Sequence, residues 1–170
     1  GYNHFAIAQS IKGALEDIVN LANADNNGAY LFSGTMTKPK DIKDANPGLN
    51  DMPFEIVQGA STSANPSGLT VVFKGNNKDI NVNITDKSSE TINTKAEDLF
   101  GAGGTEALQK IIDIYNVVAY DTAGNQRPAN TLLNANEIAK LNTLQKNVAD
   151  KYDEMNVLAS VNGSKINRLN

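Results

Sequence analysis

The sequence predicts an α+β protein in which a discontinuous bundle of long helices, a coiled-coil-like rod, carries an inserted small antiparallel β domain. Apolar residues recur at helical spacing near both ends of the chain, whereas residues 36–100 hold short alternating runs between turn residues. Neither amphipathic end can bury its apolar stripe alone, so the two ends must pair. We expect a helical rod domain from residues 1–37 and 101–170, and a β domain from residues 38–100.

The first segment, residues 3–31, has the pattern of an amphipathic helix. Ile11, Leu15 and Ile18 belong to a stripe that continues to Ala22, with steps of three and four residues. We expect this stripe to form one side of the helical packing seam.

The middle of the chain predicts short strands. The runs at 53–57 and 80–85 alternate between apolar and polar residues, and the β-branched run at 69–73 is typical of a more buried strand. Residues 75–79 lie between the last two runs and indicate a hairpin, and residues 89–94 offer a further strand. Together these runs predict the inserted β domain.

Helical periodicity returns at residues 104–120, where Thr105 is the expected N-cap residue. The preceding run GAGGT, residues 101–105, is rich in glycine but matches neither the P-loop nor the dinucleotide-binding pattern. We therefore interpret it as a hinge that returns the chain from the β domain.

Residues 134–170 carry the strongest structural pattern. Asn134 followed by Glu137 predicts a capping box at the start of a long helix. Heptad positions then follow over nearly five heptads, with polar residues at Gln145 and Asn162. The apolar members of this seam are Ile138, Leu141, Val148, Tyr152, Met155, Ile166 and Leu169. The seam can pack within the chain alone or also against neighbouring subunits, and the pattern does not separate the two.

The composition argues against several functional classes. The absence of cysteine excludes disulfides, thiol catalysis and cysteine-ligated metals, and a net charge of −4 does not favour nucleic-acid binding. No apolar run approaches the roughly 20 residues of a transmembrane helix. The single histidine, His4, is expected on the surface, and the acidic clusters do not match a calcium loop. We expect no catalytic residues, no cofactor and no metal.

The run GAYLFSGT, residues 28–35, sets a hydrophobic triplet, Tyr30 to Phe32, at the predicted end of the first helix. With the preceding Leu-Ala-Asn, it resembles the flagellin family, in which a helix carrying Leu-Ala-Asn leads into G-x-Y-L-F-[SA]-G-T. The matching motif residues are Gly28, Tyr30, Leu31, Phe32, Gly34 and Thr35. Where the family often has a basic residue, this chain has Ala29. The close of the β region at 98–101 and the final run 164–170 also resemble the family.

The resemblance implies a structural subunit of the extracellular bacterial flagellum, exported by the flagellar type III apparatus without a cleaved signal peptide. The end of the β region favours the proteins that join hook to filament, with a filament flagellin of short variable domain as the alternative. Implied partners are hook-associated protein 1, flagellin, copies of the chain itself and an export chaperone, and neither nucleic acid nor a membrane. Because the family normally extends beyond both ends, the resemblance implies a core fragment that stays monomeric.

Two other classes stay open. An enzyme or ligand-binding insert is disfavoured because residues 36–100 contain neither histidine nor cysteine. The second alternative is an adhesin-like β module on a helical stalk, and no feature of the sequence tests it. We further expect Tyr30, Leu31 and Phe32 to be at least partly buried and to lock the first helix to the last.

Overall fold

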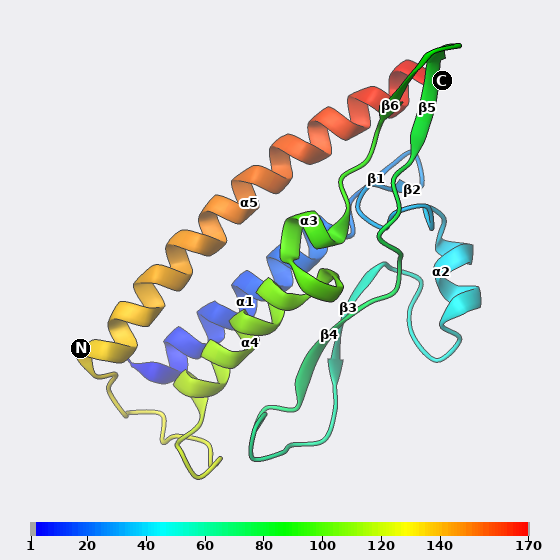
Figure 1. The fold of residues 1–170 in the computed structure, drawn as a ribbon. Coiled ribbons are helices and arrows are strands. Elements are labelled where there is room, and N and C mark those ends of the chain that lie inside the picture. The colour runs from blue at the N-terminus through cyan, green and yellow to red at the C-terminus, as the bar shows by residue number, and fades with distance from the viewer. Residues whose placement is uncertain (1–2, 170) are drawn as a thin grey trace.

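The computed structural model describes residues 3–169 and has an α+β fold of long helices and small antiparallel sheets (Figure 1). Residues 1, 2 and 170, which the predicted domain boundaries include, lie outside the described residues. The helices are α1 (His4–Ala22), α2 (Pro39–Ala45), α3 (Ala96–Phe100), the 3₁₀ turn η1 (Ala102–Gly104), α4 (Glu106–Ala119) and α5 (Ala135–Leu169). The strands are β1 (Asp25–Asn26), β2 (Ala29–Tyr30), β3 (Phe54–Gln58), β4 (Leu69–Phe73), β5 (Asn81–Thr85) and β6 (Ser88–Thr91).

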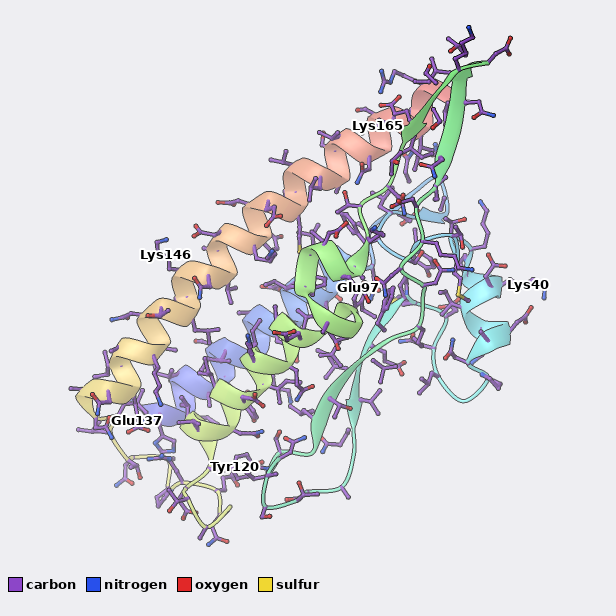
Figure 2. All side chains as sticks on the ribbon, in the orientation of Figure 1. Lys40, Glu97, Tyr120, Glu137, Lys146 and Lys165 are labelled. Carbon is purple, nitrogen blue, oxygen red and sulfur yellow. The ribbon has the colours of Figure 1, made fainter. Side chains whose placement is uncertain are left out.

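Helices α1, α4 and α5 lie side by side at one end of the molecule (Figure 1). With 35 residues against 19 in α1 and 14 in α4, α5 extends past both partners. Its far end lies beside the β5–β6 hairpin, where Asn162 donates to the Thr94 hydroxyl at 2.9 Å and Lys165 is 3.7 Å from Glu90 (Figure 2).

The first helix is shorter than predicted. It ends at Ala22, not at residue 31, and the chain then reverses at Asn27 and Gly28, which both have positive φ, 54° and 82°. Two successive residues of this kind form a tight hairpin turn between β1 and β2. The prediction treated the aromatic residues as the last turn of the helix, whereas the chain has already reversed.

The sheets are three separate two-stranded pairs. β3 pairs with β4 from Phe54 opposite Phe73 to Gln58 opposite Leu69, and β5 pairs with β6. The predicted hairpin at residues 75–79 is therefore wrong. That segment is held instead by Asn76, whose backbone N–H donates to the Ser33 carbonyl at 3.1 Å. At the position where the turn-forming residues predicted a hairpin, Asn76 instead makes a hydrogen bond to a residue far away in the sequence.

One hydrophobic cluster joins the helices to the β3–β4 sheet. The rings of Phe54 and Phe100 pack edge to face with centroids 5.6 Å apart, and Phe73 lies 4.8 Å from Phe54. The cluster continues through Leu15 on α1 and Ile112 on α4. It contains residues from both predicted domains, whose boundaries stay a prediction.

The predicted starts of the later helices are largely confirmed. At α5, the Asn134 side chain accepts from the Glu137 N–H at 2.8 Å, and the Glu137 carboxylate accepts from the Asn134 N–H at 3.1 Å. This is the reciprocal capping box. Thr105 occupies the N-cap position of α4 but makes no side-chain capping bond. Helix α2, which begins with Pro39 in its first turn, was not predicted.

Candidate functional site

The junction segment, residues 28–35, connects the helical part of the molecule to the β3–β4 region. Its hydrophobic triplet is buried, with exposed fractions of 9% for Tyr30, 4% for Leu31 and 0% for Phe32. The Tyr30 N–H donates to the Thr37 carbonyl at 2.8 Å, and its phenol donates to the Asp51 carbonyl at 2.8 Å. The hydrophobic side chains thus enter the core, while the backbone of the segment bonds to the residues on either side of it, Ala24 and Thr37.

The two motif glycines occupy left-handed backbone conformations, with φ of 82° at Gly28 and 67° at Gly34. At Gly34 the constraint is also steric. A Cβ atom there would lie 2.0 Å from the Asn76 side-chain oxygen and 2.3 Å from the Asn76 carbonyl oxygen. Only glycine permits this close approach.

Asn76 clamps the end of the junction segment. Its side-chain oxygen accepts from the Thr35 N–H at 2.9 Å, and its amide donates to the Thr35 hydroxyl at 2.7 Å. These bonds join segments that are 41 residues apart in the sequence. Thr35 was predicted as a motif residue, but its partner was missed because turn-forming asparagines and clamping asparagines look alike in a sequence.

Other asparagines make further links that sequence reasoning missed. Asn23, at the end of α1, bonds the backbone of Phe54 twice, accepting from its N–H at 2.8 Å and donating to its carbonyl at 2.9 Å. Asn26 donates to the Asn167 side chain at 2.9 Å on α5. Asn26 of β1 therefore links the β1–β2 hairpin to α5 by a hydrogen bond. The only sequence signal was the place of Asn23 in the Leu-Ala-Asn run.

The structure divides the predicted seam into buried and exposed members. Buried members are Ile11, Leu15, Ile18, Leu141 and Met155, and half-buried members packed on the core are Ile138, Val148 and Ile166. Tyr152 and Leu169 are 39% and 51% exposed. Leu144, outside the predicted heptad, is buried, whereas Gln145 is exposed. Because α1 and α4 are shorter than α5, they cover only part of its length.

His4 is buried, which corrects the expectation of a surface residue. Its side chain is 2% exposed, and its Nδ1 and Nε2 atoms lie 2.5 and 3.3 Å from the carbonyl oxygens of Thr131 and Arg127. The loop between α4 and α5 folds over the start of α1. Arg127 also pairs with Glu137 at 3.2 Å, so the loop joins the beginnings of two helices.

Two ionisable side chains near the junction segment have shifted pKa values. Burial is the main cause that raises the pKa of Tyr30, and the negative charges of Asp51 and Asp25 add to it. Burial also lowers the pKa of Lys74, which Glu55 opposes from 3.8 Å. The Lys74 ammonium donates to the Asn50 carbonyl at 2.9 Å. Its bonds tie the end of β4 to the loop before β3.

Within residues 3–169, no group of three or more histidine, cysteine or acidic side chains is placed to hold a metal ion. Over the same residues, no helix has the length and apolar character needed to cross a bilayer. The contacts of the junction segment are therefore the packing of its buried side chains and the hydrogen bonds that anchor its backbone.

Comparison of the chain with protein-family models, with curated proteins and with solved structures found no match.

Proposed function

We propose that this chain is a structural, non-catalytic subunit of the bacterial flagellum, most like flagellar hook-associated protein 3, the protein of the hook–filament junction. The proposal includes extracellular location and export by the flagellar type III apparatus. A filament flagellin with a short variable domain is the alternative.

The observation that carries the proposal is the agreement between motif and backbone in the junction segment. Gly28 and Gly34 both take conformations that favour glycine, and Leu31 and Phe32 are buried below 5% exposure. The motif residues serve to turn, bury and anchor the chain, which is what a structural protein requires of them. Because these residues were chosen from the sequence alone, their agreement with the structure supports the resemblance to the flagellin family.

The proposed rod consists of α1, α4 and α5 packed in the manner of a coiled coil. In this proposal two exposed seam residues contact neighbouring subunits: Tyr152, which lies at the edge of the α1–α5 contact, and Leu169, at the end of α5 beyond its partners. Those neighbours are hook-associated protein 1, flagellin and further copies of the chain. An apolar residue left exposed at a seam position is well suited to such contacts.

Complementation tests the proposal directly. A gene encoding the protein that carries this sequence is expressed in a motile bacterium that lacks its own hook–filament junction protein. We expect restored motility and filaments that stay attached to the hook. The Gly34→Val variant serves as a matched control, because its side chain collides with Asn76 and should abolish the rescue.

Two results would count against the proposal. Long filaments built from this protein alone favour the flagellin alternative. A secreted, folded protein that neither restores motility nor forms filaments argues against both flagellar functions.

A further inference from the structure

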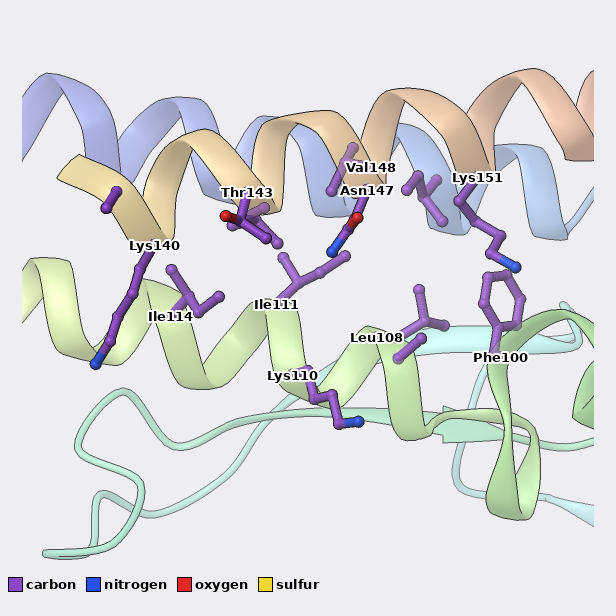
Figure 3. Close-up of a pocket in the computed structure, with 14 residues that line it drawn as sticks. Phe100, Leu108, Lys110, Ile111, Ile114, Lys140, Thr143, Asn147, Val148 and Lys151 are labelled. Carbon is purple, nitrogen blue, oxygen red and sulfur yellow. The ribbon is translucent and has the colours of Figure 1, made fainter. Parts of the chain in front are cut away.

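An apolar groove of about 490 Å³ runs along α5 on the side facing α4 (Figure 3). Ile111 and Ile114 line it from α4, and Leu144 and Val148 line it from α5. The α5 wall contains Ala139, Thr143, Asn147 and Lys151, which are four residues apart and form one ridge along the helix. Two roughly parallel walls with apolar side chains between them have the shape that a third helix fills.

The charged residues of this groove are all lysines. Lys140 and Lys151 lie at opposite ends, and Lys110 lies on the α4 wall (Figure 3). No carboxylate is among the lining residues. Lys110 and Lys151 pair with Glu106 and Glu154 at 3.3 and 3.0 Å, outside the groove, and such surface pairs are weak. Within residues 3–169, Lys140 makes no ion pair.

The other side of α5 has the opposite charge. A second groove of about 410 Å³ lies between α5 and α1, with Ile11, Leu141 and Tyr152 in its lining. Its charged residues are Asp17 and Asp153, and no lysine lines it. The two grooves share Ile18, Ile111, Leu144 and Val148 but have charged residues of opposite sign at their rims. Charge therefore decides along which side of α5 a charged partner lies.

We propose that the groove between α4 and α5 binds an acidic amphipathic helix of another polypeptide, with the apolar stripe on Ile111 and Leu144 and carboxylates at Lys140 and Lys151. Eleven residues separate these lysines, which at 1.5 Å per residue corresponds to about 16 Å, or three helical turns. The bound helix is therefore at least about three turns long, with acidic residues at both ends of its stripe. This inference does not depend on the proposed flagellar function.

The test uses two synthetic fluorescent helical peptides of about four turns. Both carry the same leucine and alanine stripe, one flanked by glutamate and the other by lysine. Fluorescence anisotropy measures their binding to the 170-residue chain at low and high ionic strength. We expect the acidic peptide to bind at least about tenfold more tightly than the basic one, with the difference reduced by salt.

Variants identify the groove. The double variant Lys140→Glu/Lys151→Glu should weaken the acidic peptide by at least about tenfold and make the basic peptide the preferred one. This gain of binding cannot arise from misfolding. Lys146→Glu is the matched control, because Lys146 lies on the outer side of α5 (Figure 2) and pairs with Asp150. It should change either affinity less than about twofold.

Four outcomes would overturn the proposal. The first is that neither peptide binds, and the second is that both bind equally. The third is that Lys146→Glu weakens binding of the acidic peptide as much as the double variant does. The fourth is that Asp153→Lys, in the other groove, changes the affinity for the acidic peptide more than the double variant does.

Discussion

Single residues fix the course of the chain at the junction segment. Gly34 and Asn76 approach each other so closely that neither can be considered alone: the glycine provides the space, and the asparagine fills it with three hydrogen bonds to Ser33 and Thr35. The contact lies at the point where the chain leaves the helical part. Adding a single methyl group at Gly34 should therefore have a large effect on stability.

Gly34→Ala should lower the free energy of unfolding by at least about 2 kcal/mol, because strain at positive φ adds to the collision with Asn76. Urea denaturation measures the change. Gly13→Ala is the control, since its new Cβ meets no atom within 4 Å, and it should stabilise α1 by about 0.5–1 kcal/mol. A loss below about 0.5 kcal/mol for Gly34→Ala would mean that the close approach relaxes easily.

Phe32→Ala should cost about 3–5 kcal/mol, since the ring is fully buried in the core cluster. The matched control is Phe5→Ala on α1, whose ring is 49% exposed and which should cost much less. Both are measured by urea denaturation. A loss below about 1 kcal/mol for Phe32→Ala would contradict the packing described for the triplet.

Tyr30 predicts a loss of stability at high pH. Its pKa is raised in the folded state, so the folded protein keeps a proton that the unfolded chain releases above about pH 10. Stability is therefore complete below that pH and falls as pH rises towards the folded-state pKa. The Tyr30→Phe variant no longer shows this dependence of the unfolding free energy on pH. It also loses the hydrogen bond to the Asp51 carbonyl, which costs about 1 kcal/mol near neutral pH.

The difference in unfolding free energy between parent and Tyr30→Phe should thus shrink above about pH 10. Urea titrations at several pH values measure it. Burial also raises the pKa of Tyr115, so Tyr115→Phe serves as the comparison for a second tyrosine with the same direction of shift. A constant difference at every pH would contradict the role given to Tyr30.

At the scale of elements, the sequence predicted what local patterns determine. The start of α5 follows from Asn134 and Glu137, and α4 follows from its apolar spacing; both agree with the structure. The prediction was wrong wherever a distant contact decided the outcome. Residues 75–79 contain turn formers, but Asn76 bonds to Ser33 and Thr35, and the strands on either side pair with other strands. No local pattern in the sequence reveals such a partner.

The capping box predicts a local effect on α5. Asn134→Ala should destabilise the protein by about 1 kcal/mol, because the N–H of Glu137 loses its acceptor. Native-state hydrogen exchange should show faster exchange in the first turn of α5. Asn142→Ala, at an exposed interior position of the same helix, should change stability by less than about 0.5 kcal/mol. Equal effects of the two variants would show that the capping bonds contribute nothing.

At the scale of the whole molecule, the hydrophobic cluster joins regions that the sequence separates. Leu15 and Ile112 belong to the helices, and Phe54 and Val71 belong to the β3–β4 sheet, yet all four lie in one cluster. The predicted boundary at residue 38 lies where helical spacing of apolar residues gives way to short alternating runs. Such a change indicates a change of secondary structure, but it does not indicate which elements share a core. The asparagine bonds of Asn23 and Asn26 add to this connection.

A shared core predicts cooperative unfolding. Far-UV circular dichroism, which reports the helices, and tyrosine fluorescence, which reports Tyr30 and Tyr115 among others, should give coincident urea transitions. Lys146→Glu, on the solvent side of α5, should leave this coincidence unchanged. Two separate transitions would contradict a single cooperative unit.

Helix α5 also has a mechanical consequence. It is continuous from the loop that encloses His4 to the hairpin bonded by Lys165, so a pull along its axis passes through backbone hydrogen bonds in series. Its buried Gly163 is the position of lowest helix propensity, and there Asn26 and Asn162 attach α5 to the rest of the chain. Under tension, α5 should yield first near this attachment, so the β5–β6 hairpin would separate before the helical end of the molecule opens.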